Sequence, residues 1–122
     1  SGNENENNSI AASGDCGASG ENLKWTLDSD GTLTISGEGK MADYVSSGEN
    51  VAPWIIYKSS LKKLVIEEGI TKIGNYAFFG CHAFTGDLII PDSVTTIGDS
   101  AFYGCDGFNG NLVVGRKIKT IF

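Results

Sequence analysis

The sequence repeats a ten-residue phrase, because AFFGCHAFTG at residues 77–86 returns as AFYGCDGFNG at residues 101–110. The similarity extends over twenty-four residues, and eleven of these positions are identical between the two full copies. A period in the twenties predicts a solenoid, in which each copy contributes one short strand and packs on its neighbour to bury a face that it cannot bury alone. The copies are residues 64–87, residues 88–111 and a partial third at residues 112–122.

The chain is long enough for one modest domain, and its composition favours β structure. At 122 residues it can bury the core of a single domain. Its 17 glycines supply tight turns at little steric cost, which favours many short elements over a few long helices. We therefore expect a mainly β fold built as a short right-handed solenoid of about 24-residue repeats.

The repeat strands divide into inward and outward side chains, because successive side chains of a strand face opposite sides. The residues expected to point inward are Leu64, Ile66, Leu88, Ile90, Leu112 and Val114. Stacked strands would set the outward residues in a row, and those are Val65, Ile89 and Val113. An apolar row with a polar rim predicts a partner-binding face, and the rim residues are Lys63, Asp87 and Asn111. The plainer interpretation is that β-branched residues suit any pleated surface.

The segments before the repeats differ from them. Residues 1–21 are expected to be a flexible polar tail, because their first nine residues contain no apolar side chain. Residues 22–60 are expected to cap the repeats of residues 61–122, beginning with a β-hairpin in LKWTLDSDGTLTISG. The DSDG turn also resembles part of a calcium loop. The register that puts Asp28 and Asp30 at the third and fifth ligand positions lacks the first and twelfth ligands, so we expect a turn and no metal site.

Charge and motifs argue against several classes of function. The net charge is −6 and no basic stripe is present, so we expect no nucleic-acid partner. No run of eighteen apolar residues occurs, so we expect no membrane insertion, and we expect a signal peptide to have been removed. The single histidine, His82, excludes a multi-histidine metal site, and no cofactor-binding fingerprint appears. We therefore expect no enzyme activity and no cofactor.

The three cysteines do not predict a disulfide scaffold. Cys81 and Cys105 occupy the same position of successive copies, where parallel Cβ vectors about 4.8 Å apart fit a disulfide poorly, so we expect buried free thiols. Cys16 has no obvious partner. Cys81 beside His82 suggests a thiol nucleophile, but adjacent side chains tend to point apart and the second copy has Asp106 in place of the histidine.

The repeats resemble the BspA-type leucine-rich repeats of bacterial surface proteins. The resemblance rests on IPDSVTTIGDSAFYGC at residues 90–105 and on the more divergent IEEGITKIGNYAFFGC at residues 66–81. The stretch CGASGENLKWTLDSDGTLTISGEGKMADY, followed by APW, is similar to the segment that precedes such repeats in secreted proteins. Glu67 and Gly115 stand where the second copy has Pro91, so the pattern is not fully kept.

The resemblance implies an extracellular or cell-surface, non-catalytic module that binds a protein, such as host extracellular matrix or a cell-surface protein, for adhesion. The alternative is a structural spacer or targeting appendage of a larger secreted or cell-wall enzyme. Carbohydrate binding would need aromatic platforms on the exposed sheet, where the expected residues are aliphatic. The partial third copy also predicts self-association through its open edge, which would hide Ile118, Ile121 and Phe122.

Overall fold

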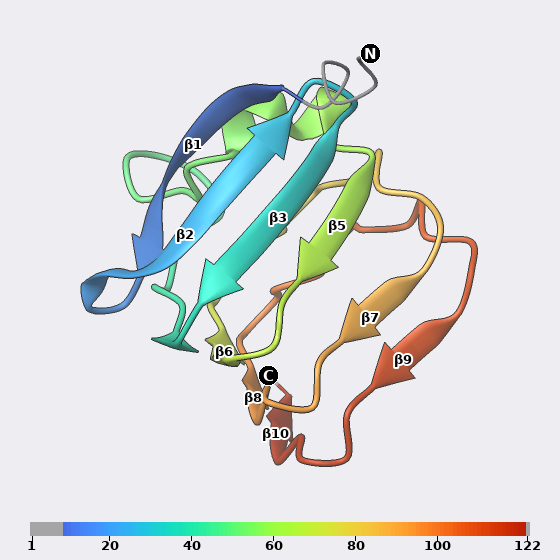
Figure 1. Cartoon of the computed structure of the whole chain (residues 1–122). Coiled ribbons are helices and arrows are strands. Elements are labelled where there is room, and N and C mark those ends of the chain that lie inside the picture. Colours follow the sequence, from blue (N-terminus) through green and yellow to red (C-terminus); the bar gives the residue numbers. More distant parts are fainter. Residues whose placement is uncertain (1–8, 122) are drawn as a thin grey trace.

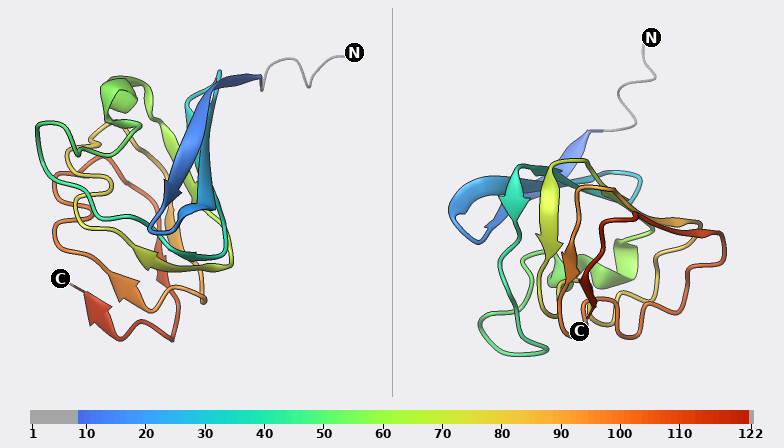
Figure 2. Two further views of the ribbon diagram at one scale, coloured as in Figure 1. Left: turned by 90° about the vertical axis from the view of Figure 1, so that its left-hand side faces the viewer. Right: turned by 90° about the horizontal axis from the view of Figure 1, so that it is seen from below.

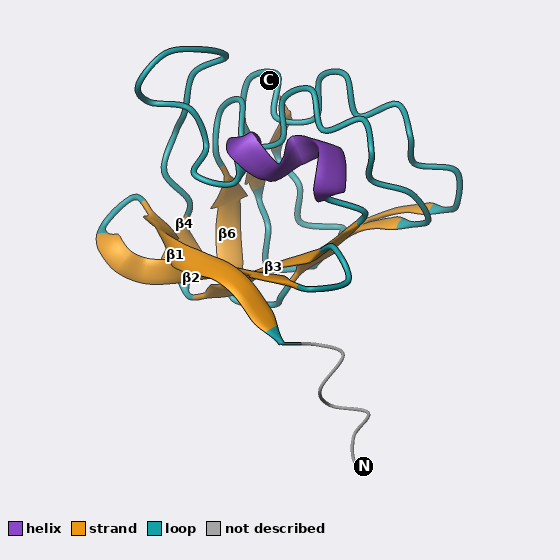
Figure 3. Cartoon of the chain, turned by 90° about the horizontal axis from the view of Figure 1, so that it is seen from above, coloured by secondary structure: helices purple, strands orange, loops and turns teal. Residues whose placement is uncertain are grey.

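The computed structural model of the chain describes residues 9–121 and consists mainly of short β-strands (Figure 1). Within the described residues the strands form three sheets, with orders β1-β2-β3-β5, β10-β8-β6-β4 and β7-β9. A 3-10 helix, η2 (Ile55–Ser60), lies across the core from β3 (Figure 3). The strands are β1 (Ile10–Gly17), β2 (Gly20–Asp28), β3 (Thr32–Gly37), β4 (Gly39–Lys40), β5 (Lys63–Ile66), β6 (Ile70–Ile73), β7 (Leu88–Ile90), β8 (Thr96–Ile97), β9 (Leu112–Val114) and β10 (Thr120–Ile121).

The predicted hairpin is confirmed, because β2 and β3 pair antiparallel with Trp25 opposite Ile35. Its turn is held by a side chain: the N–H of Thr32 donates to Asp28 Oδ1 at 3.0 Å. Gly31 has a φ of +90°, which a side chain would strain. The DSDG stretch therefore forms the expected turn. Among the described residues, no group of three or more His, Cys, Asp or Glu side chains could hold a metal ion.

The expectation of a flexible tail is wrong for residues 10–17, which form β1. This strand pairs antiparallel with β2, with Ala12 opposite Leu27 and Gly14 opposite Trp25. Cys16 at its end is 3% exposed. The strand is rich in small residues and carries no hydrophobic alternation, so its stability comes from the backbone ladder with β2, which composition does not reveal. The first eight residues of the expected tail lie outside the described part of the chain.

The segment before the repeats has the same layout as the repeats themselves. Strand β3 runs parallel to β5, with Leu33 opposite Leu64, and β4 runs parallel to β6. Across the core, the ring of Trp54 stacks on that of Phe78, which stacks in turn on Phe102. Successive turns of backbone therefore lie side by side from this segment onward (Figure 2).

Equivalent residues of successive copies face one another. Strand β7 pairs with β9 with Leu88 opposite Leu112, and β6 pairs with β8 with Ile73 opposite Ile97. Side chains add contacts at the same spacing: the N–H of Asp99 donates to Asn75 Oδ1 at 2.8 Å. Within the part of the chain that is described, no buried charged or polar side chain interrupts the core.

Three of the inward positions in the first two copies are buried, Leu88 is half-buried, and the inward positions of the third copy are exposed. Leu64, Ile66 and Ile90 are 2–7% exposed, as the alternation predicts. Leu112 is 67% and Val114 41% exposed, because β9 is the last strand of its sheet and no described residue pairs with its outer edge. The third copy therefore presents an unpaired edge and the apolar side chains that would line a coil.

Candidate functional site

Strands β5, β7 and β9, which carry the outward residues, lie on one face of the molecule (Figure 1). Ile89 and Val113 face each other across the β7–β9 ladder and are 53% and 49% exposed. Val65 is half-buried on β5. The face also includes Thr34, which the sequence analysis did not single out and which lies opposite Val65 because β3 and β5 are parallel.

The expected continuous stack of three repeat strands is interrupted between β5 and β7. Strand β5 pairs with β3 and β7 pairs with β9, but β5 and β7 are not neighbours in any sheet. At one end, the N–H of Thr85 donates to the carbonyl of Lys62 at 2.9 Å and joins the two chain segments. Gly86 follows with a φ of +79° and precedes β7. Val65 and Ile89 therefore border a gap and do not form a closed row.

A groove of about 660 Å³ occupies this gap. Four of the six predicted partner-binding residues line it, and they are Lys63, Val65, Asp87 and Ile89. Val113 lies on β9 and Asn111 directly precedes that strand, and neither residue lines the groove. Rim residues that the sequence analysis missed are Lys62, Thr85 and Gly86. No local sequence signal marks these residues, because the equivalent step at residues 109–110 precedes β9, which pairs with β7.

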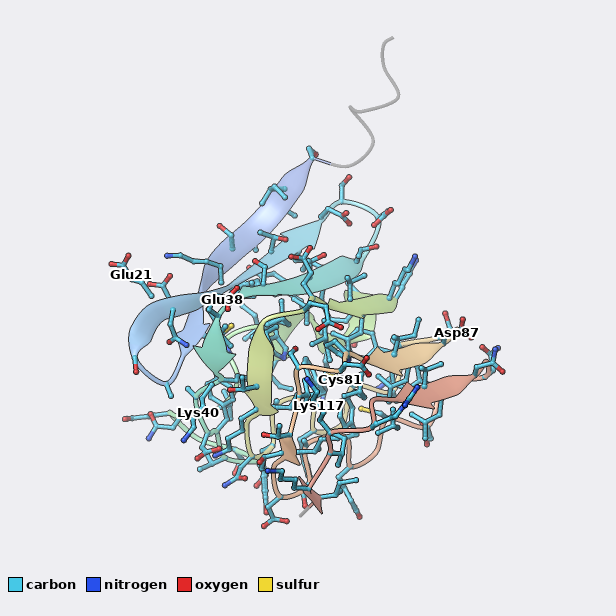
Figure 4. All side chains as sticks on the ribbon, turned by 60° about the horizontal axis from the view of Figure 1, so that its bottom comes forward. Glu21, Glu38, Lys40, Cys81, Asp87 and Lys117 are labelled. Carbon is cyan, nitrogen blue, oxygen red and sulfur yellow. The ribbon has the colours of Figure 1, made fainter. Side chains whose placement is uncertain are left out.

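Asp87 also has a structural role in this face. Its Oδ1 accepts the N–H of Asn111 at 2.7 Å, which ties the start of β9 to the start of β7. The side chain stands at the outer edge of the molecule near β7 (Figure 4). The carboxylate therefore fixes the position of Val113 beside Ile89.

A second, polar groove of about 580 Å³ lies over β6 and β8. Its lining includes Lys72 and Asn75, both of which contact Asp43. Partial burial of Asp43 acts to raise the pKa of its carboxyl, but the Asn75 N–H and the Lys72 ammonium outweigh it and lower that pKa. These contacts hold the segment before the repeats against the first repeat.

The cysteines are placed for packing. All three are free thiols; Cys16 and Cys81 are buried, whereas Cys105 is only half-buried and donates from Sγ to the carbonyl of Phe78 at 3.0 Å. Burial, reinforced by the neighbouring Cys105, raises the pKa of Cys81 to about 12. Its side chain lies inside the molecule (Figure 4), whereas His82 is exposed. The pair therefore lacks both the thiolate and the geometry that a nucleophile and base require.

No helix within residues 9–121 is long and apolar enough to cross a membrane. The sequence profile of the family described as "BspA type Leucine rich repeat region (6 copies)" matches residues 50–122. The crystal structure of a leucine-rich repeat protein from Eubacterium ventriosum ATCC 27560, at 2.50 Å resolution, is similar to this fold with a TM-score of 0.70 and 30% sequence identity. That similarity covers 91% of this chain and 28% of the other, so this chain spans little more than a quarter of its relative. No protein with a curated description matches the sequence.

Proposed function

Because the chain belongs to the BspA-type leucine-rich repeat family, we propose that it is a non-catalytic protein-binding module of a secreted or cell-surface bacterial protein, with adhesion as its role. Leucine-rich repeats generally serve as protein-interaction folds, and this family is typical of bacterial surface proteins. The partner is a protein, such as host extracellular matrix or a cell-surface protein. The acidic net charge of −6 disfavours nucleic acid.

The proposed contact surface is the outward face of the repeat strands. Its residues are Lys63, Val65, Asp87, Ile89, Asn111 and Val113. The observation that carries the proposal is the groove between β5 and β7, where half-exposed Ile89 borders a hollow with a charged rim. An apolar pocket surrounded by polar groups can desolvate an anchor side chain of a partner and orient it through the rim.

The proposed architecture behind this surface is a right-handed solenoid of about 24-residue repeats. Residues 22–60 act as the cap and residues 61–122 as the repeats. The parallel pairing of β3 with β5 favours this arrangement, because it gives the cap a strand in the same direction as the repeat strands. The partner surface then lies on the strand side of the coils.

A pair of matched substitutions tests the proposed surface. Ile89→Glu places a charge beside the groove, whereas Ile56→Glu makes the same change at a 78% exposed residue of η2, outside the groove. Binding of each purified variant to a panel of immobilised extracellular-matrix proteins is measured by surface plasmon resonance. We expect Ile89→Glu to weaken binding at least about tenfold and Ile56→Glu to leave it unchanged. Equal effects of the two variants would exclude this face.

The alternative function is a structural spacer or targeting appendage of a larger secreted or cell-wall enzyme. Its distinguishing expectation is that the module contributes only distance and orientation, so neither substitution changes any binding. If the native chain binds no member of the panel and both variants fold as the native chain does, the spacer function replaces adhesion.

A further inference from the structure

The sequence contains a single Asn-Gly step, Asn109–Gly110, and it lies near the end of the second copy. In such a step the backbone nitrogen of the second residue can attack the side-chain amide of the first, and glycine hinders this attack least because it has no side chain. We propose that Asn109 is a self-modification site, at which deamidation is held back by contacts with Gly86 and, once it occurs, detaches β9 from β7. This inference does not depend on the function proposed above.

Gly86 engages both reacting groups of the step. Its N–H donates to Asn109 Oδ1 at 2.9 Å. Its carbonyl accepts the N–H of Gly110 at 2.9 Å and the N–H of Asn109 at 3.2 Å. The attacking nitrogen and the amide are thus tied to the same residue of the preceding repeat. The peptide plane cannot turn toward the side-chain carbon until these contacts open, so the rate depends on local opening of the last repeat.

The fold requires the glycine but not the asparagine. A Cβ at Gly110 would lie 2.1 Å from Asp87 Oδ1, so no larger residue fits there without displacing that carboxylate. The residue equivalent to Asn109 in the preceding copy is Thr85, which is followed by Gly86. A Thr-Gly step cannot form the cyclic imide, so the reactive step is particular to the second copy.

The reaction is balanced by water alone. The Gly110 nitrogen loses its proton and bonds to the Asn109 side-chain carbon, and the bond from that carbon to Nδ2 breaks to release ammonia. Water then opens the five-membered imide on either side. One product is aspartate, and the other is isoaspartate, in which the backbone runs through the former side chain. Both products make the chain one charge more negative.

The isoaspartyl product lengthens the backbone where the third repeat begins. Two contacts depend on the present spacing: Asn111 N–H to Asp87 Oδ1 at 2.7 Å and Leu88 N–H to the Asn111 carbonyl at 2.9 Å. Both lie at the start of the short β7–β9 ladder, in which Val113 is held opposite Ile89. The inserted atom shifts Asn111 and removes this register. Val113 then leaves the face that it shares with Ile89.

Mass spectrometric peptide mapping of the whole chain tests the site. The protein is incubated at mildly alkaline pH with and without denaturing urea, and conversion to aspartate and isoaspartate is followed at each asparagine. Asn50, Asn75 and Asn111 serve as internal references, because larger residues follow them. We expect Asn109 to convert ahead of these references and at least about tenfold more slowly in the folded chain than in urea. Equal rates in both conditions would overturn the control by Gly86.

The variant Asn109→Thr copies the residue of the preceding repeat. It provides the control for the proposed detachment of β9 from β7. After prolonged incubation, we expect amide hydrogen exchange at residues 112–114 to accelerate in the native chain and to remain unchanged in Asn109→Thr. If the isoaspartyl chain keeps the protection of these amides, the proposed detachment of β9 is wrong. If both chains lose protection equally, the loss does not come from Asn109.

Discussion

The indole of Trp54 stacks on the ring of Phe78 with centroids 5.4 Å apart and an interplanar angle of 20°. The same indole donates from Nε1 to the carbonyl of Ala77 at 2.8 Å. Phe78 is itself stacked on Phe102 at 5.3 Å. One column of rings therefore joins the segment before the repeats to both full repeats. A substitution in this column should lower the stability of the whole fold.

Phe78→Ala should lower the free energy of unfolding by about 3–5 kcal/mol, because it removes a fully buried ring and leaves a cavity between two others. Phe102→Ala is the matched control. This ring is half-buried in the last full repeat, so the decrease in the free energy of unfolding should be smaller. Urea unfolding followed by tryptophan fluorescence measures both. Equal decreases in the free energy of unfolding would mean that the ring of the first repeat contributes no more to stability than the ring at the end of the column.

Trp54→Phe should destabilise the chain by about 1–3 kcal/mol even though it keeps a ring in the column. The substitution removes the only donor of that side chain, and the Ala77 carbonyl is left without its buried partner. Thermal unfolding followed by circular dichroism measures the loss. Trp25→Phe is the comparison, because the buried Nε1 of Trp25 has no hydrogen-bond partner in the described part of the chain. A larger effect at Trp25 would contradict the role of the Trp54 hydrogen bond.

Stability should fall at alkaline pH. Burial, with a smaller contribution from Asp15, raises the pKa of Cys16 to about 12. Burial is also the main cause that raises the pKa of Cys81 to about 12. A thiol whose pKa is raised in the folded state stabilises that state fully at pH values below its unfolded pKa of 9.0. This contribution to stability is lost as the pH rises toward 12. Urea midpoints measured from pH 8 to pH 11 should therefore decrease. Cys81→Ala should flatten that decrease, and an unchanged slope in this variant would contradict the assignment.

The stability that Asp43 contributes should instead be lost at acid pH. Its pKa is lowered in the folded state, because its contacts with Asn75 and Lys72 exceed the effect of burial. The stability that it contributes is present above the unfolded value of 3.8 and is lost as the pH falls below it. Asp43→Asn should therefore reduce the acid dependence of the urea midpoint. Glu49→Gln is the control, because Glu49 is exposed and has no ion pair among the described residues.

The sequence predicted the features that repeat or alternate locally. Leu64 and Ile66 are buried and Ile89 is exposed because strand alternation sets them, and the turn at Asp28 forms because its side chain bonds the backbone nearby. These are short-range rules that one sequence carries in full. The family resemblance is confirmed by the profile match over residues 50–122.

The features that the sequence did not reveal depend on pairing between distant segments. Strand β1 is rich in small residues without alternation, and only its ladder with β2 makes it a strand. The parallel pairing of β3 with β5 puts Thr34 beside Val65, which no local pattern indicates. Strands β5 and β7 are not neighbours in any sheet, which the repeat pattern does not indicate, so a row expected to be continuous became a groove.

The open edge of the third copy should promote self-association. Strands β9 and β10 end their sheets, and Leu112 and Ile121 are 67% and 65% exposed. An edge with unpaired backbone groups and apolar side chains favours pairing with another chain. We expect residues 1–122 to self-associate with increasing concentration in light scattering coupled to gel filtration. Leu112→Lys should return the chain to a monomer, because a charged side chain on an edge strand opposes pairing, whereas Ile56→Lys should not, although Ile56 is more exposed at 78%. A native chain that stays monomeric at every concentration would show that this edge closes without a partner.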